Sequence, residues 1–328
     1  MNSPAVLQPR AGNRSVTLRK APIMRNPEQR KHNKTTDLFA IRPEDLTWEA
    51  PFSNRVDIAA ISHPGLVRES NEDHYLVIRF NRMLENLSTN IPNGALENCF
   101  NLVGYGILVA DGMGGMAGGE IASSQALRKM VELLVDTPDW IMSLRRLRDL
   151  NTVMWRMTER FQQVDAALRT QAEEEIDLRG MGTTLTVVGM LGKDLVIGHV
   201  GDSRAYLFRD GNLVQLTSDH TLAQRLIDAG VAKPDDPAAR SMRHVLTSAV
   251  GSFGDKTEPQ IHHKELAERD QLLVCTDGLT DMLTDSTIAS VLSESRSAQN
   301  ACQAMTDLAL SAGGLDNVTV VVARFGYS

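Results

Sequence analysis

The chain has 328 residues, of which 42% are hydrophobic and 23% charged, an ordinary composition that excludes fibrous and low-complexity classes. Residues 1–36 contain eight Lys or Arg and a single acid, so the formal net charge of −7 places −14 on the remaining residues. An acidic body of this kind argues against a nucleic-acid partner.

The cysteines and the hydropathy profile indicate a cytoplasmic protein. Cys99, Cys275 and Cys302 are odd in number and widely spaced, which fits a reducing compartment better than a disulfide framework. No segment approaches the roughly 18 apolar residues of a membrane span. The beginning of the chain also lacks the apolar core of a signal peptide. We expect a cytoplasmic monomer.

Residues 1–50 are predicted to form a disordered basic arm and linker. Their acid-poor, basic composition also resembles an organelle transit peptide. Pro4, Pro9, Pro22 and Pro27 would interrupt the amphipathic helix that such a peptide needs, so the arm is the favoured interpretation.

The folded body is expected to occupy residues 51–328, beginning with strands at 56–61 and 75–80 and a third that runs into Asp111. A loop insertion is predicted over 81–101, which is rich in Asn and contains Pro92 and Gly94. Apolar residues at helical spacing predict helices over 120–135 and about 139–175.

Short apolar runs then predict strands, with a tight turn at Asp210-Gly211. The expected strands are 183–190, 195–200, 205–208, 213–215, 271–276 and 317–324. Helices are expected over 220–230 and 298–310, and a mobile flap over about 225–258, a segment rich in Pro, Asp, Gly and Ser. Strands in hairpin-like succession with paired helices predict an α+β fold of mostly antiparallel sheets flanked by helices.

Three apolar runs each meet an aspartate where a strand is predicted to begin or end, namely Asp111, Asp277 and Asp316. A carboxylate at the mouth of a buried strand is costly to desolvate unless a cation meets it. Asp-Gly pairs are common in turns, but the apolar lead-ins before Asp111 and Asp277 argue against that simple interpretation. Hard divalent cations are the simplest solution.

The candidate ligands carry oxygen and include no His or Cys cluster, which favours Mn²⁺ or Mg²⁺ over Zn²⁺. The acidic set is Glu72, Asp73, Asp111, Asp202, Asp277, Asp281 and Asp316. Gly112 would let its backbone approach an ion closely. Two such ions would lower the pKa of a water molecule and clamp a phosphoryl group. The planar guanidinium of Arg68 could hold two phosphate oxygens.

Six motifs in this order resemble the metal-dependent serine/threonine phosphatases of type 2C, the PPM family, in their bacterial form. They are Gly65-Leu66-Val67-Arg68-Glu69-Ser70-Asn71-Glu72-Asp73, Asp111-Gly112-Met113-Gly114-Gly115, Gly180-Met181-Gly182-Thr183-Thr184, Gly201-Asp202-Ser203-Arg204, Asp277-Gly278 and Asp316-Asn317. The resemblance covers about residues 56–325. It implies a four-layer α/β/β/α fold around a central antiparallel β-sandwich, with the metal site at one end of the sandwich.

The same resemblance implies the site residues and the activity. Asp111 and Asp277 would bridge or flank two metal ions, the Gly112 carbonyl and Asp316 would complete one shell, and Glu72 or Asp73 would serve the other. Asp202 and Asp277 would share a third, weaker ion, and Arg68 would hold the substrate phosphate. The substrates would be phosphoserine and phosphothreonine proteins, so the protein would oppose a serine/threonine kinase.

The chain departs from the family pattern at Met113, where many eukaryotic members have a histidine proposed as general acid. His220 is the nearest replacement by motif, although a structural role at a helix N-terminus is the simpler expectation. The arm and the insertion at 81–101 are a second departure, on which the resemblance says nothing.

Competing functions find less support in the sequence. Residues 112–117 match a weak dinucleotide-binding pattern, but the second strand with its acid is missing. A Walker phosphate-binding loop is excluded because the chain has no Gly-Lys-Ser/Thr at this position. A cysteine-dependent phosphatase needs an Arg six residues after the nucleophile, where the three cysteines are followed by Tyr105, Asp281 and Leu308. A phosphatase-like binding domain without turnover remains the alternative.

Overall fold

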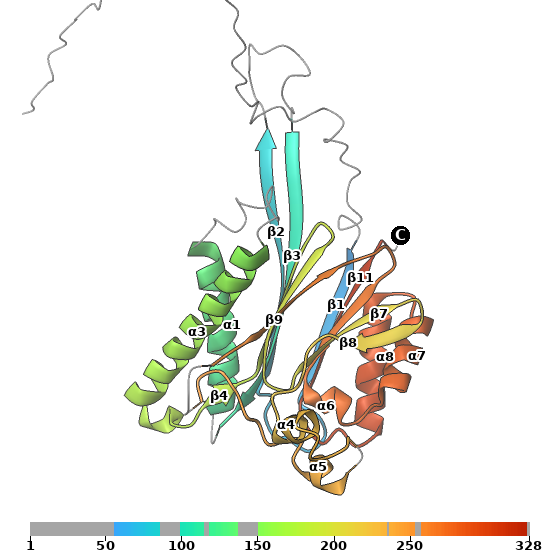
Figure 1. Ribbon diagram of the computed structural model, residues 1–328. Helices are drawn as coiled ribbons and strands as arrows, with labels where there is room; N and C mark the ends of the chain where they lie inside the picture. Colours follow the sequence, from blue (N-terminus) through green and yellow to red (C-terminus); the bar gives the residue numbers. More distant parts are fainter. Residues whose placement is uncertain are drawn as a thin grey trace, which may run out of the picture. The chain divides into compact units, whose positions relative to one another are not determined.

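Figure 1 shows a computed structural model of the chain. The structure describes residues 56–85, 99–114, 118–136, 150–234, 236–252 and 257–326. These residues belong to one unit, Trp48–Ser328. The predicted arm at 1–50 lies outside the described residues.

Two antiparallel sheets form the centre of this unit (Figure 1). The first sheet has the strand order β1 (Val56–His63), β11 (Val318–Phe325), β10 (Gln271–Cys275), β7 (Arg204–Arg209) and β8 (Asn212–Gln215). The second has the order β2 (Asp73–Glu85), β3 (Cys99–Met113), β5 (Leu185–Leu191), β6 (Asp194–Val200) and β9 (Gln260–Glu265), and β4 (Gly182–Thr183) pairs with β3.

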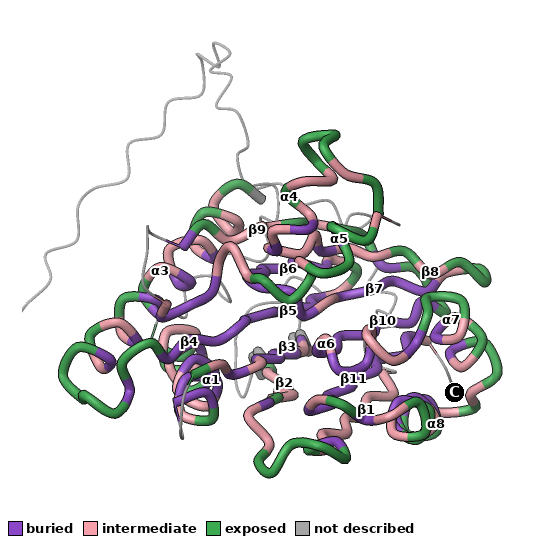
Figure 2. Tube along the Cα trace, turned by 90° about the horizontal axis from the view of Figure 1, so that it is seen from below, coloured by how far each residue is buried: buried purple, intermediate pink, exposed green. Residues whose placement is uncertain are grey.

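Alternating side chains place β3 between two apolar cores. Ile107 and Val109 pack in the core between the sheets, together with Val274 and Val321 of the other sheet. Leu108 and Ala110 point to the opposite face and join the core under the helices. This period of two is the geometry of an extended strand, here covered on both faces. Figure 2 shows the same burial along the central strands.

Helices cover the outer face of each sheet, which confirms the α/β/β/α arrangement. On the second sheet lie α1 (Gly118–Asp136) and α3 (Leu150–Glu174), followed by the short η4 (Ile176–Leu178). On the first sheet lie α6 (Asp277–Thr280), α7 (Asp285–Glu294) and α8 (Ala298–Ser311). Two further helices, α4 (Leu222–Asp228) and α5 (Pro237–Ser241), lie apart from these layers (Figure 1).

The predicted loop over 81–101 is wrong at both ends. Strand β2 continues to Glu85 and β3 begins at Cys99, with the register unbroken from Asp73↔Asp111 to Glu85↔Cys99. Pairing with a partner strand therefore outweighs the low strand propensity of Asn81 and Asn101. Residues 86–98 lie outside the described residues.

Other boundaries shift by a few residues, and several short or surface elements were not predicted. The helix expected from residue 220 begins at Leu222, with Thr221 as its cap, and the predicted flap contains α5. Strand β9 was missed because QIHHKE has no buried apolar run, and α7 because only Ile288 and Leu292 are buried. The four-residue α6 is too short to give a periodic signal.

Within the described residues, no helix combines the length and apolarity that crossing a membrane requires. The Asp210-Gly211 turn between β7 and β8 is confirmed, since both residues have positive φ angles of 51° and 81°.

Candidate metal centre

A cavity of about 590 Å³ opens where the two sheets bring their carboxylates together. Seven of the eight site residues that the resemblance implies line it, from strand ends and loops of both sheets. They are Arg68, Glu72, Asp111, Gly112, Asp202, Asp277 and Asp316. The eighth, Asp73, is only 4% exposed.

Asp73 lies opposite Asp111 in the β2–β3 register. Its Oδ2 accepts a 2.8 Å hydrogen bond from the Thr276 hydroxyl. Its Oδ1 is buried and has no hydrogen-bond partner among the described residues. Burial, opposed by hydrogen bonds from Thr319 and Thr276, raises the pKa of Asp73 to about 7.

The pKa values of Asp111 and Asp202 are raised in the same way as that of Asp73. Burial, followed by the charges of Asp73 and Asp277, raises the pKa of Asp111 well above its ordinary value. Burial and the charge of Asp277 raise the pKa of Asp202 to about 8. The Gly180–Thr184 motif fixes Asp111, because the Asp111 amide donates to Thr184 Oγ1 at 2.9 Å and the Asp111 carbonyl accepts from the Thr184 amide at 2.9 Å.

Asp277 is the first residue of α6 and, like Asp73, has one carboxylate oxygen without a hydrogen-bond partner among the described residues. This oxygen is Oδ1, which is buried. The next residue must be glycine here, since a Cβ on Gly278 would collide with the Asn317 carbonyl oxygen. This close approach joins the start of α6 to the start of β11.

Glycine is required at position 112 for a similar reason. A Cβ on Gly112 would collide with the Gly119 carbonyl oxygen and would lie 2.8 Å from the Glu72 carbonyl oxygen. The Gly112 amide donates to that Glu72 oxygen at 3.1 Å. Burial raises the pKa of the Glu72 carboxyl, while the charge of Arg68 opposes the shift.

Asn317 organises the loop that carries Arg68 and Glu72. Its Nδ2 donates to the carbonyl oxygens of Pro64 and Ser70, each at 2.9 Å. Its Oδ1 accepts from the Glu72 amide at 2.8 Å. The Asp316-Asn317 motif therefore supplies a cavity-lining carboxylate and a structural amide side by side.

The predicted phosphate ligand Arg68 already has an anionic partner. Its Nη2 lies 2.7 Å from Asp316 Oδ2, and the two side chains are 57% and 37% exposed. The hydrogen bond that Arg68 donates to Asp316 and the charge of Asp316 raise the pKa of Arg68.

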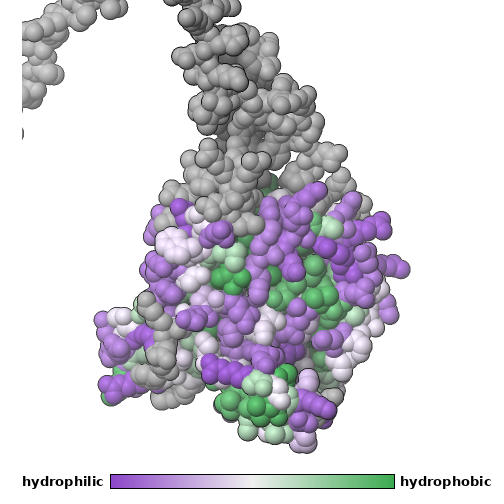
Figure 3. All heavy atoms as spheres, viewed as in Figure 1, coloured by the Kyte–Doolittle hydropathy of each residue, from purple (hydrophilic) through white to green (hydrophobic). Residues whose placement is uncertain are grey.

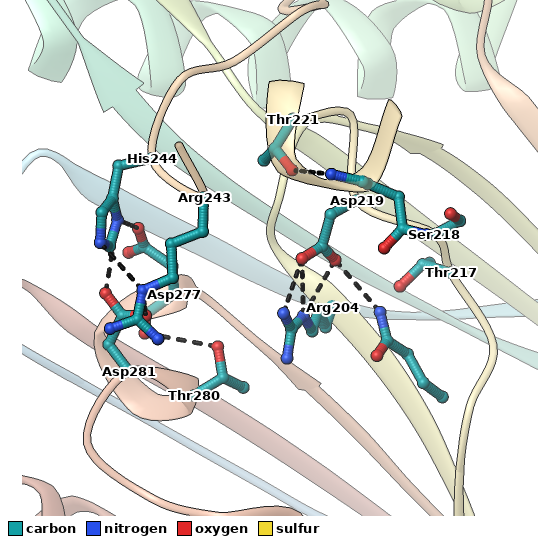
Figure 4. A network of polar contacts seen from close by, with 12 residues as sticks. Arg204, Thr217, Ser218, Asp219, Thr221, Arg243, His244, Asp277, Thr280 and Asp281 are labelled. Atoms are coloured by element: carbon teal, nitrogen blue, oxygen red, sulfur yellow. Dashed lines mark hydrogen bonds and ion pairs between the residues drawn. The ribbon is translucent and has the colours of Figure 1, made fainter. Parts of the chain in front are cut away.

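His244 was missed from the sequence, because it lies in the predicted flap at no recognisable spacing from another candidate. It lines the cavity, and its Nδ1 lies 3.5 Å from Asp281 Oδ2 and 3.9 Å from Asp277 Oδ2. The neighbouring carboxylate of Asp277 and the charge of Asp281 raise the pKa of His244. Figure 4 shows His244 and Arg243 directed toward these two carboxylates. Asp281 itself is not among the cavity-lining residues.

His220 lies outside this cavity and has a structural role. Its Nδ1 accepts a hydrogen bond from the Gly201 amide at 3.1 Å, and its own amide donates to the Gly201 carbonyl at 2.7 Å. Burial lowers the pKa of His220. The sequence suggested that His220 lies at the N-terminus of a helix, but the residue that caps α4 is Thr221. The neighbouring Asp219 forms an ion pair with Arg204 at 2.6 Å (Figure 4).

The segment that contains α4 and α5 presents apolar side chains to solvent. Val231 and Val245 are exposed, and Figure 3 shows hydrophobic atoms gathered at the lower end of that view, where Figure 1 places α4 and α5. Residues 244 and 246 of the same segment line the cavity.

The donor set fits hard divalent cations. The cavity is lined by carboxylates and no lysine, and two buried carboxylate oxygens have no hydrogen-bond partner among the described residues. Burial, together with the charges of neighbouring carboxylates, holds the pKa of Asp111, Asp73 and Asp202 high. Oxygen donors of this kind suit Mg²⁺ or Mn²⁺.

Comparison with known proteins assigns the chain to a family. The profile of the protein phosphatase 2C family matches residues 99–311. The chain belongs to the protein phosphatase 2C family. It is 36% identical over 265 residues to the serine/threonine protein phosphatase PstP of Mycobacterium tuberculosis, covering 81% of this chain and 44% of PstP. This phosphatase 2C chain therefore spans under half the length of that relative.

Shorter relatives and solved structures agree with the assignment. The serine/threonine phosphatase stp of Listeria welshimeri is 36% identical over 218 residues, which cover 66% of this chain and 83% of stp. The crystal structure of M. tuberculosis PstP superposes with a TM-score of 0.65 at 33% identity, covering 82% of this chain and 98% of that one. A further structure, with a TM-score of 0.63 and 33% identity, covers 82% of this chain and 97% of the PstP catalytic domain, described in complex with two manganese ions. The phosphatase 2C fold implied by the six motifs is thus confirmed.

Proposed function

We propose that this protein is a metal-dependent phosphatase that hydrolyses phosphoserine and phosphothreonine in proteins. The observation that carries the proposal is the pair of buried carboxylate oxygens, Asp73 Oδ1 and Asp277 Oδ1, which have no protein partner among the described residues. Buried carboxylates without partners are costly, and cations relieve the cost. The PstP and stp relatives, both named as serine/threonine phosphatases, support the reaction class.

A two-ion Mn²⁺ or Mg²⁺ centre would be held by Asp111 and Asp277. The Gly112 carbonyl and Asp316 would complete the shell of one ion, and Glu72 or Asp73 would serve the other. Asp202 with Asp277 would serve a possible third ion. Bound ions would lower the pKa of an attacking water and neutralise phosphate charge. The PstP structure with two manganese ions supports this composition.

The protein's own side chains would orient the substrate. Arg68, at the exposed edge of the cavity, would exchange Asp316 for two phosphate oxygens through its planar guanidinium. The loop network around Asn317 would keep Arg68 and Glu72 in place. Met113 lines the cavity where an imidazole would be needed for acid catalysis, so protonation of the serine or threonine leaving group needs another donor.

Release of inorganic phosphate from phosphoserine and phosphothreonine peptides, with Mn²⁺, with Mg²⁺ and with a chelator, tests the proposal. We expect turnover with the metals and none with the chelator. Specific binding of the same peptides without phosphate release in any metal would instead favour the alternative, a phosphatase-like binding domain.

The biological setting follows as part of the same proposal. Opposing a serine/threonine kinase is the natural role for this reaction, and the catalytic domain would span residues 51–328. Cys275 and Cys302 are free and buried, which supports a reducing compartment such as the cytoplasm.

A further inference from the structure

Three exposed aliphatic side chains, which we name the apolar rim, lie beside the phosphate-binding edge of the cavity. Leu66 is 65% exposed, Val67 62% and Leu315 57%. Val67 directly precedes Arg68 and Leu315 directly precedes Asp316, so the two segments joined by the Arg68–Asp316 ion pair both contribute to the rim.

Backbone contacts hold the two segments of the rim together. The Leu66 amide donates to the Gly314 carbonyl oxygen at 2.7 Å. The Leu66 side chain lies against Gly314, because a Cβ built on that glycine would be 3.0 Å from Leu66 Cγ. Asn317 fixes the same loop at Pro64 and Ser70. The exposure of the rim therefore belongs to an anchored loop.

The position of the rim specifies its occupant. Consecutive Cα atoms are about 3.8 Å apart, so the backbone of Val67 adjoins that of Arg68, and the backbone of Leu315 adjoins that of Asp316, which the Arg68 guanidinium contacts at 2.7 Å. An extended peptide advances about 3.4 Å per residue. An extended substrate whose phosphate is bound at Arg68 would therefore pass the two segments that carry Leu66, Val67 and Leu315.

We propose that the apolar rim binds an aliphatic side chain that flanks the phosphorylated residue of a protein substrate. This inference rests on the proposed phosphatase function and adds a sequence preference to it. Arg68 recognises the phosphate in any substrate, and the rim favours those with an apolar neighbour because contact removes apolar surface of both partners from water.

The preference can be measured with two phosphothreonine peptides that differ only in the residues on either side of the phosphothreonine, leucine in one and serine in the other. The readout is the ratio of their kcat/KM values with Mn²⁺. We expect the wild-type protein to favour the leucine peptide about five- to tenfold, since tenfold corresponds to about 1.4 kcal/mol and burying part of a leucine supplies about that much.

Substitution of the rim supplies the decisive comparison. The double variant Leu66→Ser, Val67→Ser and the single variant Leu315→Ser should reduce the ratio toward one. Val214→Ser is the matched control, because Val214 is an exposed valine on β8 and belongs to neither of the two segments that form the rim. It should retain the wild-type ratio. A ratio near one in the wild-type protein, or an equal loss in the control, overturns the inference.

Two further measurements separate the rim from the function. Turnover of p-nitrophenyl phosphate, which has no flanking residues, tests the phosphatase activity alone, so its presence together with equal use of both peptides refutes only the rim. If neither peptide is hydrolysed, fluorescence anisotropy of both labelled peptides still tests the rim, which requires tighter binding of the leucine peptide. Sedimentation of the wild-type protein and the double variant tests a second copy as occupant, and dimerisation lost in the variant would contradict the substrate assignment.

Discussion

Arg68 Nη2 and Asp316 Oδ2 are 2.7 Å apart, although one belongs to the predicted phosphate site and the other to the predicted metal site. Both side chains are substantially exposed, so the ion pair contributes only about 0–1 kcal/mol. Such a contact can be exchanged at low cost. Asp316 is then free to bind a cation, and Arg68 to bind the phosphate that the cation attracts.

Replacing Arg68 should therefore separate substrate binding from metal binding. Arg68→Ala should raise KM for phosphopeptides about ten- to a hundredfold, because a charge-assisted hydrogen bond contributes about 1.5–3 kcal/mol. It should leave Mn²⁺ affinity equal or a few times tighter, since Asp316 loses a competitor. Arg68→Lys keeps the positive charge but lacks the planar guanidinium, so its KM should lie between those of the wild-type protein and Arg68→Ala. Calorimetric titration that showed a collapse of Mn²⁺ affinity in Arg68→Ala would make Arg68 structural.

Conversion of Asp277 to asparagine should weaken the metal centre. Asp277→Asn keeps the volume but removes a charge that offsets the cations, so Mn²⁺ affinity and Mn²⁺-dependent turnover should both fall at least tenfold. Asp210→Asn is the control, because Asp210 lies in the β7–β8 turn at φ 51°, a conformation that asparagine also adopts. Full turnover by Asp277→Asn at limiting Mn²⁺ would contradict the assignment.

The sequence predicted the parts of this protein that strong local signals specify. The all-buried strand Val318–Phe325 gives a continuous apolar run, and the aspartates that follow or precede such runs did converge on one cavity. Strand β9 and helix α7 were not predicted, because each lies at a surface and buries too few side chains to give a periodic pattern of apolar residues in the sequence.

Contacts distant in sequence could not be predicted. His244 meets Asp277 and Asp281 only because the segment after α5 lies over the start of α6. The partner of Arg68 is 248 residues away, and the resemblance that identified Arg68 as a phosphate ligand did not include this pairing.

Removing the side chain of Asn317 should loosen the loop that carries Arg68 and Glu72. Asn317→Ala leaves the Glu72 amide and the carbonyl oxygens of Pro64 and Ser70 without their partner. An unsatisfied buried group costs about 1–3 kcal/mol, and partial access of water to this loop leads us to expect about 2–3 kcal/mol in total. Urea unfolding measures the loss. Asn212→Ala, at an exposed residue of β8, should change stability by under about 0.5 kcal/mol, and an equal effect of the two substitutions would contradict the role of Asn317.

The stability of the metal-free protein should fall as the pH rises through neutrality. Burial raises the pKa of Asp73 to about 7 and that of Asp202 to about 8, so between an unfolded value of 3.8 and these values the folded state binds more protons than the unfolded chain. Their contribution is full below about pH 4 and is lost as the pH passes the folded pKa values. Buried His199 acts in the opposite sense. Its pKa is lowered from 6.5 to about 3, so its contribution to stability is full above about pH 6.5 and is lost as the pH falls below that value.

The window from about pH 6.5 to 8.5 therefore excludes His199, and within it the carboxylates and His244, whose pKa is also raised, act in the same sense. In chelator, Tm should decrease across this window. With saturating Mn²⁺ the decrease should disappear or reverse, because deprotonated carboxylates are the form that binds metal. Asp202→Asn provides the control, since it removes one titrating group and should flatten the slope in chelator. A metal-free Tm that rose across the window would show that these aspartates are already ionised in the folded protein, and that the orphaned oxygens of Asp73 and Asp277 are compensated without a cation.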